Sequence, residues 1–290
     1  MSDSDTVKES RRVLCSIRDH LTIAHRNLGA ERQSVGLVDV TYHPDNRSPY
    51  LNYVSPRRKT AWIPGPQIEA GIDQLRAHGR TPRVYYFEGL YPPIFAKTLR
   101  ELGLTVESET ALMACKLDDE NMPERPAMPS EMRVEFPETQ EGIALWWYVR
   151  NNAFYDVITH GTEPIYIGRD LREVVLGNQV DILLYRYSQP VGVARLTFNK
   201  STAHLSALSL MKEIRTPENI KLMYKIALYR AAEQGASLIF TSGETETDRS
   251  LSRQVGFVDS GSIVCYAEAP GNVEPEAEDV HVAEPIFILR

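Results

Sequence analysis

The sequence predicts an α+β protein with mixed sheets, made of two copies of one unit in tandem. One local pattern occurs twice: an apolar strand, a short helix, a glycine and a second strand. An internal repeat that includes its turns and helix ends indicates repeated structural units. The length of 290 residues suits two domains of roughly 130–150 residues each. The first copy of the pattern covers 84–88, 92–102, Gly103 and a strand through 112–113, and the second covers 238–241, 248–255, Gly256 and a strand through 263–264.

The elements before the first copy of the pattern are predicted from periodicity and from turn residues. A helix is expected over residues 5–30, because Val13, Ile17 and Leu21 recur on one helical face before Gly29 ends it. The first unit is expected to end near Leu117. Its other elements are strands at 36–42 and 50–54 and a helix at 65–77, which begins at a Gly-Pro pair and ends at a His-Gly pair.

Residues 118–130 are expected to link the two domains, since 118–129 hold three prolines and four acids. The predicted domains are therefore 1–117 and 131–290. Within 131–290 we expect strands at 132–136, 180–187, 191–198 and 203–210, helices at 139–153, 169–176 and 218–233, then the second copy of the pattern, an acidic stretch at 272–279 and an added strand at 282–289.

Composition excludes several classes of protein. The net charge of −7 and the pI near 5.6 provide no general attraction to nucleic acids or anionic membranes. The apolar runs are shorter than the roughly 20 residues of a membrane span, and the acidic N-terminus is unlike a signal peptide. Cys15, Cys115 and Cys265 are far apart, so neither a disulfide framework nor a zinc site is indicated. We expect a soluble, cytoplasmic protein with no membrane partner.

The two endings resemble the closing half of the GNAT superfamily of N-acyltransferases. They read Leu-Arg-Glu-Leu-Gly-Leu at 99–104 and Leu-Ser-Arg-Gln-Val-Gly-Phe at 251–257. The resemblance covers most of 131–268 and, more thinly, 37–117. It implies two GNAT-like domains, of which the first is a degenerate copy and the second carries the acyl-transfer site. Mycothiol synthase and the Fem-type aminoacyl transferases are similar in this doubling.

The resemblance also implies a donor site. In the family, the pantetheine arm lies between the fourth and fifth strands, and a loop V-x-P-x-x-[QR]-x-x-G-x-[GA] holds the coenzyme A pyrophosphate on backbone N–H groups. Here the loop is 210–220, where Arg215 matches the basic position but Glu218 and Ile220 replace glycines. A loop that no longer holds phosphate is the alternative. The expected donor contacts are Leu210, Lys212, Arg215, Asn219 and Ser242.

Acyl transfer to an amine needs a base for the amine proton and an acid near the leaving sulfur. His204 on a strand and Glu244 after the next strand are the candidate bases. Ser252 takes the place of the tyrosine that often serves as the acid in the family, and Leu99 takes it in the first unit. The alternatives are a partnered structural histidine and a solvated serine.

Residues 154–160 join two helices, and in the family this connection walls the acceptor pocket. Tyr155, Asp156 and His160 are the expected substrate contacts, with the carboxylate pairing with a cation. Core packing for Tyr155 and a turn role for Asp156 remain as alternatives.

The implied activity is N-acyl transfer from acetyl-CoA or another acyl thioester, used as cosubstrate, to a primary amine of a small molecule, without a metal. Two alternatives follow from the altered loop. The donor could be an acyl-carrier protein thioester or aminoacyl-tRNA, which do not present the coenzyme A pyrophosphate. The chain could also be a non-catalytic binding protein with the same fold.

Overall fold

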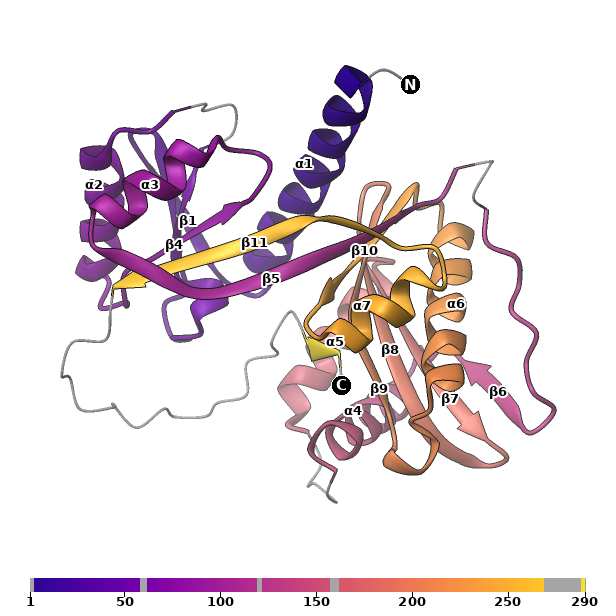
Figure 1. Cartoon of the computed structure of the whole chain (residues 1–290). Coiled ribbons are helices and arrows are strands. Elements are labelled where there is room, and N and C mark those ends of the chain that lie inside the picture. Colours follow the sequence, from indigo (N-terminus) through magenta and orange to yellow (C-terminus); the bar gives the residue numbers. More distant parts are fainter. Residues whose placement is uncertain (1–2, 58–61, 119–121, 157–161, 269–287, 290) are drawn as a thin grey trace. The chain divides into compact units, whose positions relative to one another are not determined.

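The computed structural model describes residues 3–57, 62–118, 122–156, 162–268 and 288–289. The chain forms two compact units (Figure 1). Unit 1 contains residues 1–111 and 260–285, and unit 2 contains residues 112–259 and 286–290. Each unit is therefore made of two separate segments of the chain.

Unit 1 opens with a long helix and continues with strands, two of which are followed by helices. Its sheet has the strand order β1-β2-β3-β4-β11-β5. Its elements are α1 (Asp3–Asn27), β1 (Glu31–Val35), β2 (Val38–Tyr42), a 3-10 turn (Pro49–Leu51), β3 (Tyr53–Pro56), α2 (Gly65–Ala77), β4 (Arg83–Phe87), α3 (Pro93–Glu101), the first part of β5 (Leu104–Lys116) and most of β11 (Val258–Glu268).

The apolar core of unit 1 lies between its sheet and the helices α2 and α3. Gly71 of α2 allows close approach, because an added Cβ would lie 2.7 Å from Val38 Cγ2 and 2.9 Å from Val54 Cγ1. Any larger residue at this position would push α2 off the sheet. The buried members of this core include Val40, Val84 and Tyr86 from strands and Ile68, Ile72, Leu75, Phe95 and Leu99 from helices.

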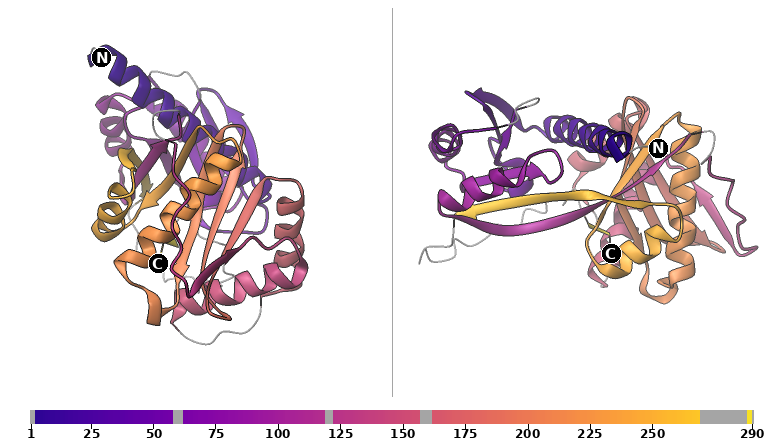
Figure 2. Two further views of the ribbon diagram at one scale, coloured as in Figure 1. Left: turned by 90° about the vertical axis from the view of Figure 1, so that its right-hand side faces the viewer. Right: turned by 45° about the horizontal axis from the view of Figure 1, so that its top comes forward.

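Unit 2 is a sheet with the strand order β5-β10-β9-β8-β7-β6, covered by helices on both faces (Figure 2). A two-residue strand, β12 (Ile288–Leu289), pairs in parallel with β9 at Ala207 and Leu208. The other elements are β6 (Met132–Glu135), α4 (Gln140–Tyr155), α5 (Pro164–Val175), β7 (Gln179–Arg186), β8 (Gln189–Asn199), β9 (Thr202–Leu210), a 3-10 turn (Lys212–Ile214), α6 (Pro217–Glu233), β10 (Leu238–Gly243) and α7 (Glu246–Arg253).

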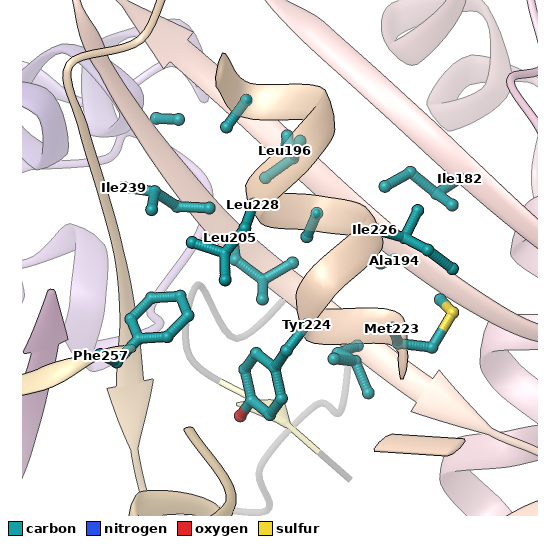
Figure 3. Packing of buried hydrophobic residues seen from close by; sticks show 14 of the residues in the cluster. Ile182, Ala194, Leu196, Leu205, Met223, Tyr224, Ile226, Leu228, Ile239 and Phe257 are labelled. Carbon is teal, nitrogen blue, oxygen red and sulfur yellow. The ribbon is translucent and has the colours of Figure 1, made fainter. Parts of the chain in front are cut away.

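The residues of β7 show how the two faces are used, since neighbours along a strand point to opposite sides. Ile182 and Leu184 pack in the core that contains α6, and Leu183 and Tyr185 pack in the core that contains α4. Figure 3 shows the α6 side of the sheet. There Met223, Tyr224, Ile226 and Leu228 of α6 meet Ile182, Leu196, Leu205 and Ile239 of the strands.

The closing strand of each repeat extends into the sheet of the other unit. β11, which ends the second repeat, pairs antiparallel with β4 from Ile263↔Phe87 to Ala267↔Arg83. Its Val264 and Tyr266 belong to the core of unit 1. Conversely, β5 ends the first repeat, and its Met113 belongs to the core of unit 2. Each unit is thus completed by a strand that the other repeat provides.

Most predicted elements are confirmed, and the helix 65–77 has the predicted bounds. The strand predicted at 36–42 is confirmed as β2, but β1 before it was not predicted: the two strands form a hairpin that turns at Gly36, whose φ is +56°. The helix predicted from residue 169 begins at Pro164. Residues 122–129 contain no helix or strand. Each compact unit combines two separate segments of the chain, so the units do not coincide with the repeats. The domain limits 1–117 and 131–290 therefore stay a prediction.

Candidate functional site

The candidate site lies where β9 and β10 of unit 2 stop pairing. The two parallel strands pair from Leu238↔Thr202 to Phe240↔His204, although β9 continues to Leu210 and β10 to Gly243. Just beyond the last pair, β9 has a bulge. Arg195 of β8 lies opposite Ala207, and the next residue, Leu196, lies opposite Leu205, so Ser206 is the extra residue. A bulge takes its extra residue out of the ladder and bends the strand.

Glu244 follows β10 at its carboxyl end, where α/β folds commonly place ligand contacts. Ser242 before it is buried, and Glu244 itself is exposed. The turn is tightly fixed: a Cβ on Gly243 would lie 2.5 Å from Arg249 Cγ, and Arg249 Nη1 donates to the Gly243 carbonyl at 3.1 Å. Thr245 then caps α7 through a reciprocal capping box with Asp248. The Glu244 carboxylate is therefore held on a rigid backbone.

His204 and Glu244 have different environments. His204 is only 1% exposed, and its ring stacks on Phe240 with centroids 4.3 Å apart and planes 2° apart. One residue beyond that pair, Thr241 Oγ1 donates to the Leu205 carbonyl at 3.1 Å. His204 thus supports the point at which the strands part, whereas Glu244 faces solvent.

Ser252 lies on α7 and is 1% exposed. Its hydroxyl donates to the Arg249 carbonyl one turn earlier, at 3.0 Å. Leu99, at the same position of the first repeat, is also fully buried. Both residues thus occupy a packed helix face, and the acid role predicted for Ser252 remains a prediction.

The predicted donor loop uses its backbone N–H groups internally. Arg215 N donates to the Lys212 carbonyl at 3.4 Å, and Thr216 N donates to the Ile214 carbonyl at 2.8 Å. At the start of α6, Asn219 N donates to the Thr216 hydroxyl, and Ile220 N donates to the Thr216 carbonyl. Pro217 has no N–H. Four N–H groups of the predicted donor loop are thus already bonded within it.

The side chains of the loop differ in what they offer. Leu210 is buried, and Lys212 is exposed. The amide of Asn219 donates to the Ile214 carbonyl at 2.8 Å, so it braces the 3-10 turn. Glu218 adds a negative charge to the first turn of α6, where the helix dipole would otherwise favour an anion.

The predicted acceptor residues lie at the end of α4. Tyr155 is 43% exposed, and Asp156 follows the helix with a φ of +52°. His160 lies outside the described residues. The Asp156 carboxylate forms an ion pair with Arg215, with Oδ1 2.7 Å from Nη2. Of the predicted donor and acceptor residues, these two therefore contact each other.

A buried ionic network on the α4 face of the sheet was not predicted. Arg195 of β8 binds Asp181 of β7, with Nε 2.7 Å from Oδ1, and Asp170 of α5, with Nη2 2.7 Å from Oδ2. All three are at most 3% exposed. Trp147 Nε1 donates to Asp170 at 2.8 Å, and the guanidinium lies 3.8 Å from the ring centre of Trp146. The sequence signal for this network was a charged residue inside each of two mainly apolar strands, Asp181 in β7 and Arg195 in β8.

The described part of the chain offers neither a metal site nor a membrane span. No three His, Cys, Asp or Glu residues there are grouped so that they could hold a metal ion. None of the helices described has the apolar length that crossing a bilayer requires.

Solved structures share this architecture. A GCN5-related N-acetyltransferase from Kribbella flavida aligns over 91% of this chain and 97% of its own, with 17% identity and a TM-score of 0.67. A GCN5-related N-acetyltransferase from Sphaerobacter thermophilus aligns over 82% and 83%, with 13% identity and a TM-score of 0.58. A tandem GNAT protein from the clavulanic acid biosynthesis pathway aligns over 81% and 79%, with 13% identity and a TM-score of 0.56.

No family model matches the chain, and no curated protein matches it in sequence. The likeness is therefore one of fold, and at that level it confirms the resemblance inferred from the two endings. The chain has the fold of a tandem GNAT protein.

Proposed function

We propose that unit 2 transfers an acyl group from a thioester to a primary amine. The observation that supports this best is the early end of β9–β10 pairing beside the bulge at Ser206, with Glu244 at the end of β10. Where β9 and β10 part, the backbone of β9 pairs with β12 at Ala207 and Leu208, so an extended donor would take the place of β12 along this stretch, and a carboxylate beside it can accept a proton. The likeness in fold to N-acetyltransferases supports the same reaction class.

In the proposed reaction a neutral amine attacks the thioester carbonyl. A C–N bond forms, the amine loses a proton to Glu244, the C–S bond breaks and the thiolate takes up a proton. Glu244 suits the base role because it is exposed and can return its proton to water. His204 is enclosed against Phe240, so we assign it support of the strand end.

Acetyl-CoA or another acyl-CoA is the first candidate donor, with Arg215, two residues before α6 begins at Pro217, as the cation for its phosphate. A carrier-protein thioester is the second. It is favoured by the internal bonding of the loop N–H groups, because this donor presents no coenzyme A pyrophosphate. Aminoacyl-tRNA shares that property, and it is the third donor to compare.

The test is thiol release from acetyl-CoA with a panel of primary amines, preceded by native mass spectrometry of freshly purified protein for a bound coenzyme A species. Glu244→Gln should lower turnover by about 100-fold or more, because an amide cannot take the proton. Glu138→Gln changes another exposed glutamate of unit 2 and should leave turnover unchanged. Turnover with a carrier-protein thioester alone would select the second donor. No turnover with any of the three donors would favour the non-catalytic binding protein.

A further inference from the structure

Arg215 joins the donor loop to the end of α4 through four contacts. Its Nε donates to the Leu210 carbonyl at 3.0 Å, and its Nη2 donates to the Ala153 carbonyl at 2.6 Å. The other two contacts are to Asp156: Nη2 lies 2.7 Å from Oδ1 and Nη1 lies 3.4 Å from Oδ2. A guanidinium has five N–H groups, so one remains for another partner.

The two kinds of contact have different strengths. The carbonyl contacts anchor the guanidinium, and the cation is favourable at the C-terminus of α4. The Asp156 contact is part-exposed, with side-chain exposures of 30% for Arg215 and 40% for Asp156. Exposed ion pairs are weak, whereas a guanidinium binds phosphate through two parallel charge-assisted bonds. A phosphate can therefore replace the carboxylate while the carbonyls keep the arginine in place.

We propose that Asp156 and Arg215 form an exchangeable pair that couples the donor to the acceptor. Without donor, Asp156 occupies the phosphate-binding side of Arg215. A donor phosphate displaces Asp156, and the released carboxylate binds a cation on the acceptor. This inference depends on the proposed function, and it adds an order of binding in which the donor comes first.

The exchange also indicates the class of acceptor. The reacting nitrogen must be neutral to attack a thioester, so it does not need a carboxylate partner. Asp156 would instead bind a second cationic group of the same molecule. The acceptors expected are therefore primary amines that carry another positive charge, such as diamines.

The donor half is tested by the affinity for acetyl-CoA, measured calorimetrically at low salt. Asp156→Asn removes the competing charge and should tighten binding about 3- to 10-fold. Asparagine tolerates the positive φ of this position, so folding is preserved. Arg215→Ala should weaken binding. The matched control is Asp259→Asn, which breaks another exposed Arg–Asp pair of unit 2, with Arg253, and should leave the affinity unchanged.

The binding results for acetyl-CoA distinguish a failure of the Asp156–Arg215 exchange from a failure of the proposed acyl transfer. If wild-type protein binds acetyl-CoA and Asp156→Asn binds it equally or more weakly, the pair is a structural brace and the exchange is wrong, while the proposed function stands. If neither protein binds acetyl-CoA, the acyl-CoA donor is wrong, and the exchange is overturned with it.

The acceptor half is tested by comparing 1,3-diaminopropane with propylamine at saturating acetyl-CoA. Wild-type protein should have a lower KM for the diamine. In Asp156→Asn that KM should rise about 10-fold with little change in kcat, so that the preference disappears. Equal KM values for both amines in the wild type would overturn the assignment of Asp156 to a second cation.

Discussion

The two units bury polar groups on one face of the sheet in different chemical forms. In unit 2, Arg195 binds Asp170 and Asp181 away from water, so the buried layer is ionic. In unit 1, His25 of α1 meets Tyr53 of β3, with 2.7 Å between Nδ1 and the hydroxyl. Both groups of that pair are buried and neutral near pH 7.

The neutrality follows from burial. Removal from water lowers the pKa of His25 to about 4, with help from His20 and Arg32, and it raises the pKa of Tyr53 to about 12. The ionic layer of unit 2 is stable only while every partner is present. The comparison teaches that one fold can satisfy a buried polar face in two ways. Unit 1 should therefore be sensitive to pH, and unit 2 should be sensitive to the loss of one residue.

The largest effect is expected when the units are separated. Fragments 1–130 and 131–290 each lack the strand that the other repeat provides, so 1–130 loses Val264 and Tyr266 from its core. Fragment 131–290 loses Met113 and Cys115. Each fragment alone should be insoluble or unfolded by far-UV circular dichroism, and co-expression should restore a soluble complex. A cooperative thermal transition in either isolated fragment would contradict the exchange of strands.

The next largest effect is expected for Arg195→Met in unit 2. It leaves two buried carboxylates without their cation and should lower the free energy of unfolding by about 3–5 kcal/mol, measured by urea denaturation. The matched change in unit 1 is Arg83→Met. It breaks the more exposed ion pair with Glu107 and should cost about 1 kcal/mol or less. Equal losses of unfolding free energy in Arg195→Met and Arg83→Met would contradict the claim that unit 2 alone depends on a buried ionic network.

Acidification should weaken unit 1. The folded pKa of His25, about 4, is below its unfolded value of 6.5, so the unfolded chain binds the proton first as the pH falls. Stability should therefore be full above pH 6.5 and should drop by about 3 kcal/mol by pH 4. The loss of stability would be measured by amide hydrogen exchange of peptides from α1 and β3 as the pH is lowered. The variant His25→Gln should lack this component, and an unchanged pH profile would contradict the assignment.

The smallest stability effect is expected for Ser252→Ala. The serine hydroxyl bonds within its own helix, so its removal should change stability by less than about 1 kcal/mol. Leu99→Ala at the same repeat position of unit 1 should cost about 2–5 kcal/mol through a core cavity. If Ser252 steadies the leaving thiolate, turnover falls while donor affinity is kept. Wild-type turnover would exclude that role.

The sequence predicts the elements well where local chemistry decides them. The Gly-Pro start at Gly65 and the His78-Gly79 end define α2, because these residues act within one turn of the helix. The hairpin at Gly36 and the start of α5 at Pro164 were missed, although both have turn or N-terminal signals. The strand β1 was missed because its residues 31–34 are polar and exposed, so it has no alternating apolar pattern.

The pairing of distant segments could not be predicted. Periodicity indicates that β5 and β11 are strands but not which sheet each one joins, because an apolar strand fits the interior of either. The same limit applies to the site. The pairing of Arg215 with Asp156 joins residues 59 positions apart, and the network around Arg195 needs three elements to meet.

The exchanged strand also sets the time at which the protein can fold on the ribosome. Unit 1 needs the segment that begins at Ser260, which follows the end of its first segment, Ala111, by 149 positions. Translation adds roughly 5–20 residues per second, so β11, which pairs with β4, begins to be synthesised roughly 7–30 s after Ala111. An open strand edge is prone to association with other chains. The nascent chain should therefore depend on chaperones until almost all of it has been translated.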